Sequence, residues 1–237
     1  MKSLTEETLY ELQAVARYLD TSKDLWVVVL QGQGDHFSSG VDLELIQSRL
    51  DKPDKANRKL LSDLQACFDE FEALEKPTIA KLDGFCMGGG LVLALCCDFR
   101  IASRRTVFSL PEVQLGLPIL MGTQRLTRVV GMGATKEMIL LSERLNARKA
   151  QEYGMLHQGV PLDELDDVVR KFAEKFLTLP PRTVGLAKRT INVGCDMTLQ
   201  ESQELEIDTL TELLKSPDVM EAFESYTEKR PPKFSGE

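Results

Sequence analysis

The stretch Asp83-Gly84-Phe85-Cys86-Met87-Gly88-Gly89-Gly90 runs straight into the apolar segment 91–97, and it decides the fold. Three successive glycines let the backbone approach a ligand closely and adopt a positive φ where needed. The segment after them has no polar face, which predicts a helix buried in the core. Free N–H groups in the first turn of such a helix favour developing negative charge. Tight helix–strand packing is the alternative explanation for the glycines, and no Gly-Lys-Ser/Thr follows them as in a P-loop.

Strand and helix patterns alternate around this stretch. Apolar runs at 26–30, 78–82, 99–103 and 107–110 predict strands, and the run 26–30 is expected to be buried on both faces. Helical spacing of apolar residues marks 4–19 and 55–74. Such alternation indicates an α/β core of βα units. From about Thr123 the pattern is mostly helical, with helices expected at 163–177, 183–193, 199–214 and 217–226.

Composition places the chain among ordinary globular proteins and narrows its partners. The 237 residues are 43% hydrophobic and 28% charged, with a formal net charge of -8. This acidic balance argues against general binding to nucleic acid or to an anionic membrane. No apolar run is long enough to span a bilayer, and the acidic amphipathic start resembles neither a signal nor a transit peptide. We therefore expect a cytoplasmic protein.

The five cysteines predict no metal site. They are odd in number, mostly in apolar surroundings, and none forms a CxxC pair. Buried reduced thiols are the expectation.

Two further segments accompany the glycine stretch. Phe37–Leu43 (FSSGVDL) follows the first predicted strand, and Leu110–Gly116 (LPEVQLG) follows the last. Together with KPTIAKLDGFCMGGG, LCCDFRIAS, GTQRLTRVVG, ERLNARKAQEYGMLHQGVP, PPRTVGLAKRTIN and EAFESYTEKRPPKFSG, they resemble the enoyl-CoA hydratase/isomerase (crotonase) family. The resemblance covers essentially the whole chain, in order.

This resemblance implies a fold and an assembly. We expect a crotonase-type spiral of ββα units over residues 1–165 and a helical oligomerisation region over 166–237, giving a homotrimer or hexamer. Family members usually begin with a strand pair and an RPxxxNAL-type loop that contributes to coenzyme A binding. This sequence starts within the equivalent of the helix that follows, so we expect either that the hairpin is missing or that the numbering starts at a late methionine.

The resemblance also implies the site. The backbone N–H groups of Val41 and Gly89 would hold the thioester oxygen of an acyl-CoA as it becomes an enolate, and losing one such donor typically costs about 10²–10³ in rate. Coenzyme A enters as part of the substrate, with no separate cofactor, in a reaction of fatty acid metabolism. Residues around these donors are expected to contact substrate: Ser39, Gly40, Asp42, Leu43, Gly88, Val92 and Leu117.

The carboxylates differ from those of the family's hydratases, which use two glutamates. Val92 occupies the position of one, and Glu112, in the Pro-Glu pair, is retained as the expected catalytic group. We expect Glu112 to lie among Leu110, Val113, Leu115 and Val92, where desolvation raises its pKa. One base suffices to move a double bond, so isomerase chemistry is favoured. The loop that follows, Leu117–Gly122, has lost glycines usual in the family to bulky residues.

Other interpretations stay open. A hydratase (lyase) using one glutamate, a decarboxylase or thioesterase acting on an acyl-CoA, and a non-catalytic crotonase-fold subunit all fit an oxyanion site with one carboxylate. Glu112 by itself could also be a structural turn or pairing residue. We expect His36 to be a solvated loop residue and His157 and Asp98 to be structural.

Overall fold

Four parallel strands form the first of two sheets in the computed structural model, which describes residues 3–236. Their order is β1 (Val28–Gln31), β2 (Thr78–Leu82), β4 (Phe99–Ser103) and β7 (Gln158–Val160). Residues 1, 2 and 237, at the outer limits of the two predicted regions, lie outside the described residues.

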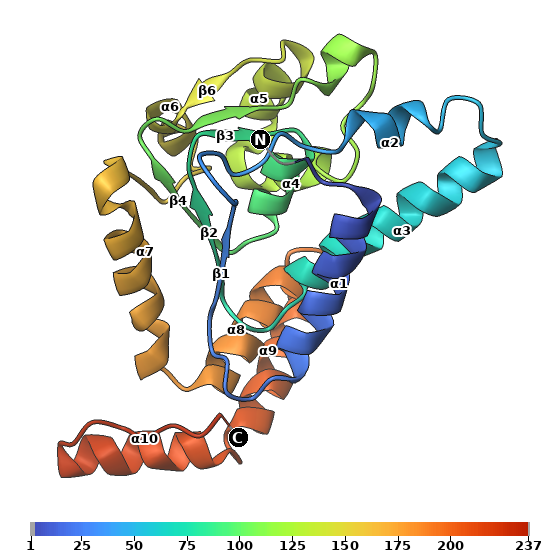
Figure 1. Ribbon diagram of the computed structural model, residues 1–237. Helices are drawn as coiled ribbons and strands as arrows, with labels where there is room; N and C mark the ends of the chain where they lie inside the picture. The colour runs from blue at the N-terminus through green and yellow to red at the C-terminus, as the bar shows by residue number, and fades with distance from the viewer. Residues whose placement is uncertain (1–2, 237) are drawn as a thin grey trace.

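A second sheet of three strands contains the strands that follow β2 and β4 along the chain. Its order is β3 (Phe85–Met87), β5 (Val107–Ser109) and β6 (Leu145–Asn146). The chain runs from β2 into β3 and the helix α4 (Gly89–Leu95), then from β4 into β5 and the helix α5 (Thr123–Leu140). Strand, strand and helix thus repeat, and the turns of this spiral stack because neighbouring strands pair in parallel (Figure 1). The predicted spiral of ββα units is confirmed.

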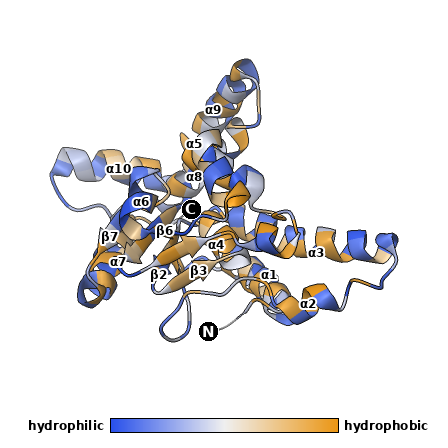
Figure 2. Cartoon of the chain, turned by 90° about the horizontal axis from the view of Figure 1, so that it is seen from above, coloured by the Kyte–Doolittle hydropathy of each residue, from blue (hydrophilic) through white to orange (hydrophobic). Residues whose placement is uncertain are grey.

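Helix α4 lies at the centre of the molecule. All seven of its residues are buried, as its lack of a polar face predicts. In Figure 2, β2, β3 and α4 share the hydrophobic colour at the middle of the fold. Phe68, Phe71, Phe108 and Leu126 pack into the same core from neighbouring elements.

Helices cover the two sheets. Helix α1 (Glu6–Thr21) packs on α3 (Asp54–Glu72), and the short α2 (Leu43–Gln47) precedes α3. Helix α7 (Leu165–Glu174) covers β2 and β4 through a second apolar cluster. The remaining short elements are η1 (Glu112–Leu115), α6 (Ala147–Glu152), η2 (Leu162–Glu164) and η3 (Phe176–Thr178).

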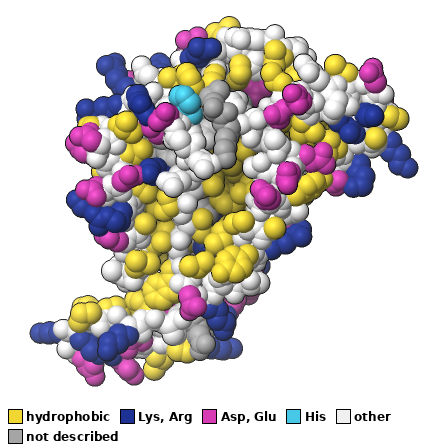
Figure 3. All heavy atoms as spheres, in the orientation of Figure 1, with side chains coloured by type: hydrophobic (Ala, Val, Ile, Leu, Met, Phe, Trp, Pro, Cys, Tyr) yellow, Lys and Arg dark blue, Asp and Glu magenta, His cyan; other side chains and the backbone are white. Residues whose placement is uncertain are grey.

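Three helices form the C-terminal part: α8 (Pro181–Gly194), α9 (Leu199–Leu213) and α10 (Pro217–Glu228). Lys188 on α8 joins this part to the spiral, because its ammonium pairs with Asp98 at 2.8 Å and donates to the Lys76 carbonyl at 3.1 Å. Helix α10 projects from the body (Figure 1), and apolar side chains gather in the hollow above it (Figure 3). The structural role expected for Asp98 agrees with this ion pair.

Strand β1 differs from its prediction. It was expected to be buried on both faces, yet Val29 is 41% exposed and the strand alternates between half-buried and exposed positions. The reason is its place at the edge of the sheet, where it pairs only with β2. An apolar run in the sequence does not distinguish an edge strand from a central one.

Candidate active site

The three glycines form a tight turn between β3 and α4. Gly88 has a φ of 52°, which favours glycine, and its N–H donates to the Ser109 carbonyl at 2.9 Å. A methyl group on Gly89 would lie 2.7 Å from Val41 Cγ2, and one on Gly90 would lie 2.5 Å from Ser38 Cβ. The glycines therefore allow the FSSGVDL segment to lie directly against the start of α4.

This approach brings two backbone N–H groups together. A Cβ on Gly89 would be 3.3 Å from the Val41 nitrogen, and a Cβ on Gly40 would be 3.2 Å from the Gly89 nitrogen. Leu4 bonds to the residues on either side of Val41, since its N–H donates to the Gly40 carbonyl at 2.8 Å and its carbonyl accepts from Asp42 at 2.9 Å. Within residues 3–236, the N–H groups of Val41 and Gly89 have no hydrogen-bond acceptor. Both donors are free to bind one oxyanion.

Glu112 supplies the carboxyl group beside these donors. It begins η1, directly after β5, and its Oε1 would be 2.8 Å from a Cβ on Gly88. Its Oε2 is buried and has no hydrogen-bond partner within the described part of the chain. Burial raises the pKa of this carboxyl group. A buried carboxyl oxygen that meets no protein donor is suited to exchanging protons with a bound molecule.

The surroundings predicted for Glu112 are only partly present. Leu110 is fully buried, but Val113 and Leu115 are 38% and 58% exposed. These two residues lie in the single turn of η1, which turns their side chains to solvent. Because these two side chains are exposed, they contribute little to the burial of Glu112.

Val92 lies one helical turn beyond the glycines and is buried. Its N–H donates to the Gly88 carbonyl at 3.1 Å, so its side chain shares a helix face with the donor end of α4. A Cβ on Gly122 would be 2.5 Å from Val92 Cγ2 and 3.0 Å from Ile119 Cγ2. The position of the second family carboxylate is thus part of an apolar contact with the 117–122 loop.

The other predicted substrate contacts are spread over two loops. Gly40, with a φ of 99°, and Ser39 belong to the donor turn. Asp42 caps α2 by accepting from the Glu44 N–H at 2.8 Å, and its hydrogen bond from the Ser3 hydroxyl lowers its pKa. Leu43 is exposed at the start of α2, whereas the Leu117 N–H donates to the Glu112 carbonyl at 3.1 Å.

Ser38, Leu4 and His36 also shape this region, although none of them is among the predicted site residues. The Ser38 hydroxyl accepts from the Gly40 N–H at 3.1 Å, and Leu4 joins the donor turn from the N-terminal segment. His36 was expected to be solvated, but its ring stacks on Phe85 and its Nδ1 accepts from the Phe85 N–H at 3.1 Å. Of the two serines in the FSSG motif, only the second, Ser39, was predicted to contact substrate. The contacts of His36 and Leu4 are with residues distant in sequence.

The remaining histidine and the cysteines lie outside this site. His157 accepts from the Arg100 N–H at 3.1 Å and packs edge-on against Phe99, in agreement with the structural role expected for it. Cys195 is exposed, which corrects the expectation of buried thiols at that position, whereas the other four cysteines are buried. Residues 3–236 contain no cluster of three or more His, Cys, Asp or Glu side chains that could hold a metal ion.

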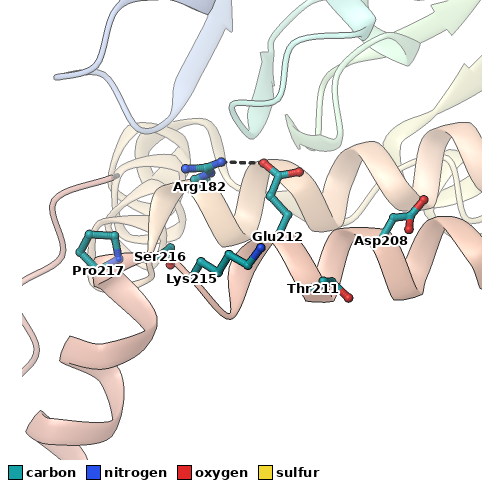
Figure 4. Close-up of a pocket in the computed structure, with 7 residues that line it drawn as sticks. All are labelled: Arg182, Asp208, Thr211, Glu212, Lys215, Ser216 and Pro217. Atoms are coloured by element: carbon teal, nitrogen blue, oxygen red, sulfur yellow. Dashed lines mark hydrogen bonds and ion pairs between the residues drawn. The ribbon is translucent and has the colours of Figure 1, made fainter.

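A separate hollow of about 500 Å³ opens among the C-terminal helices. Figure 4 shows its lining, in which Arg182 and Glu212 form an ion pair across α8 and α9 at 2.6 Å. The lining holds none of the site residues predicted from sequence and no apolar side chain except Pro217. Its position and polarity make it unsuitable as the acyl site.

No helix in the described part of the chain is long and apolar enough to cross a membrane.

Known proteins share this architecture. An enoyl-CoA hydratase from Bacillus anthracis superposes with a TM-score of 0.91 at 33% identity, over 99% of this chain and 91% of that one. A crotonyl-CoA hydratase of Syntrophomonas wolfei is 33% identical over 99% of this chain and 90% of its own length. An enoyl-CoA isomerase/hydratase of Mycosarcoma maydis is 34% identical over 89% of this chain and 76% of its own length.

The fold is therefore that of the crotonase superfamily. A family model described as enoyl-CoA hydratase/isomerase matches residues 1–237. This chain belongs to that family.

Proposed function

We propose that this protein acts on an enoyl-CoA thioester through an enolate that the N–H groups of Val41 and Gly89 hold, with Glu112 as the single acid and base. The buried, unpartnered Oε2 of Glu112 beside the donor turn carries this proposal. Negative charge that develops on the thioester oxygen would meet these two oriented N–H donors. Such donors stabilise a transition state most where water is largely excluded. The substrate brings coenzyme A with it, so no separate cofactor is required.

Hydration of a 2-enoyl-CoA is the leading reaction. Relatives with this fold carry hydratase names. The Glu112 carboxylate would accept a proton from water as the water oxygen bonds to C3 and the C2=C3 electron pair moves toward the thioester oxygen. The protonated Glu112 would then return a proton to C2 as the enolate collapses. One carboxyl group therefore balances the reaction.

Migration of a double bond from C3 to C2 is the second candidate, and the sequence alone favours it. Val92 is the observation that supports it, since a buried valine cannot orient water. Glu112 would take a proton from C2, and the dienolate would receive a proton at C4. Isomerase activity and hydratase activity both appear in the name of one relative.

One assay separates these reactions. Purified protein is incubated in D₂O with 2-enoyl-CoA and, separately, with 3-enoyl-CoA, and products are followed by mass spectrometry. A gain of one water identifies hydration, whereas bond migration leaves the molecular formula unchanged apart from deuterium. Loss of carbon dioxide or of free coenzyme A from other acyl-CoA thioesters would indicate a decarboxylase or thioesterase. No conversion of any thioester would refute the proposal and favour a non-catalytic subunit.

A further inference from the structure

Three residues in contact where α4 meets the 117–122 loop bear on which acyl groups the site accepts. This acyl wall consists of Val92, Ile119 and Gly122. Val92 and Ile119 are both buried, and a side chain at Gly122 would be 2.5 Å from Val92 Cγ2 and 3.0 Å from Ile119 Cγ2. These three positions are therefore packed so closely that no side chain beyond the glycine hydrogen fits at Gly122.

The acyl wall is placed in line with the reacting carbons. Val92 is on the same face of α4 as Gly88 and Gly89, one turn further along. Glu112 touches Gly88 from the other side and is joined through the Leu117 N–H to the loop that carries Ile119. A thioester whose oxygen lies on Gly89 and whose C2 faces Glu112 would therefore direct its next carbons toward Val92.

Hydrogen bonds and ion pairs hold the 117–122 loop in place, so that Ile119 and Gly122 stay against Val92. The Arg125 guanidinium donates to the Met121 carbonyl at 2.7 Å and pairs with Asp69 and Glu72 on α3. Met121 has a φ of 67°, a conformation that is uncommon outside glycine and that these contacts maintain. The Thr123 hydroxyl also donates to the Ile119 carbonyl at 3.2 Å.

We propose that the acyl wall restricts this enzyme to short acyl groups of about four carbons, with Val92 as the specificity-determining residue. The inference rests on the proposed function, because it assumes a thioester on the Val41 and Gly89 donors. The inference adds the length of the acyl group to the proposed function. It also gives Val92, at the position where family hydratases carry a glutamate, a role in limiting that length. Shortening Val92 removes two methyl groups and opens space directly ahead of C4.

The test is a chain-length series of 2-enoyl-CoA thioesters from four to ten carbons. The parent should prefer four carbons, and Val92→Ala should raise the ratio of kcat/KM for ten carbons over four by about tenfold, the effect of burying two further methylene groups. The control is Val169→Ala, which shortens an equally buried valine in the α7 cluster and should leave that ratio unchanged. Circular dichroism and urea unfolding verify that both variants are folded.

A binding measurement makes the inference independent of turnover. Saturated butyryl-CoA and decanoyl-CoA are titrated calorimetrically into the parent and both variants. Val92→Ala should raise the affinity for decanoyl-CoA relative to butyryl-CoA, and Val169→Ala should not. The proposed role of the acyl wall would be wrong if the parent bound both chain lengths with equal affinity. It would also be wrong if Val92→Ala left the ratio of the two affinities unchanged, even if the enzyme turns over short substrates. If chain length affects binding as expected but no thioester reacts, the proposed function fails and the wall stands.

Discussion

Glu112 is the residue on which the proposed chemistry depends. Replacing it with glutamine keeps its size but removes its capacity to take up a proton, so kcat should fall by about 10²–10⁴. Binding of substrate should change little, because the oxyanion donors are backbone groups. The measurement is deuterium exchange at C2 together with product formation. Glu204→Gln, on the exposed face of α9, is the matched control. Parent-like exchange in Glu112→Gln would show that another group is the base.

The same variant should be more stable than the parent at neutral pH. Burial raises the folded-state pKa of Glu112 above its unfolded value, so the folded state retains the proton longer as pH rises. Stability therefore falls as pH increases from the unfolded value, about 4.3 for glutamate, through the raised folded value. Glutamine carries no such charge. Urea melts should show a stability gain for Glu112→Gln above this window that vanishes below it, and a constant difference at all pH values would contradict the assignment.

Gly122 and Val92 should be energetically coupled. Gly122→Ala places a methyl group 2.5 Å from Val92 Cγ2, and such overpacking typically costs about 1–3 kcal/mol. Val92→Ala removes the obstructing carbon, so Gly122→Ala should cost clearly less in that background. A double-mutant cycle by urea unfolding measures the coupling. Strictly additive costs would mean that the two residues do not press against each other.

At the scale of elements, one buried ion pair joins α8 to the main sheet. Lys188 and Asp98 have side-chain exposures of only 9% and 19%, and Asp98 also accepts from the Thr78 N–H at 2.7 Å. Lys188→Met leaves that carboxylate without its cation and should cost about 3–5 kcal/mol in unfolding free energy. Lys59→Met, which breaks the exposed Lys59–Asp63 pair, should cost less than about 1 kcal/mol. If both variants lost a similar unfolding free energy, the buried Lys188–Asp98 pair would stabilise the fold no more than the exposed pair does.

At the scale of the whole molecule, the C-terminal helices present an apolar surface that one chain leaves uncovered. Met220, Phe223 and Tyr226 on α10 are exposed, and Figure 3 shows apolar side chains continuing into the hollow above that helix. Exposed apolar patches of this kind mark association sites. The prediction of a helical oligomerisation region over 166–237, giving a trimer or hexamer, therefore still stands as a prediction.

Light scattering at low micromolar concentration tests this assembly. The trimer should have three times the 26.6 kDa mass of one chain, and a hexamer six times. Phe223→Glu should shift the population toward monomer, because a charge would enter the apolar contact. Exposed Glu204→Gln again serves as the control. A parent protein that is monomeric throughout the concentration range would refute the prediction.

The amino-acid sequence was enough to predict an alternating α/β core, and its resemblance to the crotonase family was enough to predict the spiral. Apolar runs and helical spacing located β2, β4, α4 and the C-terminal helices, because local patterns record which residues are buried. The FSSG, GGG and Pro-Glu motifs pointed to the donor turn and to Glu112 only through their joint resemblance to the crotonase family, since each motif by itself also fits a structural role. The preference for isomerase chemistry, in contrast, came from Val92 alone, and the relatives' names favour hydration.

Tertiary structure alone decided what surrounds these residues. The exposure of Val29 depends on which strand lies at the sheet edge, and that of Val113 on the turn of η1. His36 is fixed by Phe85, 49 positions along the chain, and Val92 is closed in by Ile119 and Gly122. Such contacts join segments that are distant in sequence, and a local pattern does not record the distance between them. The free N–H groups of Val41 and Gly89 belong to the same category, because only the packing of two loops brings them together.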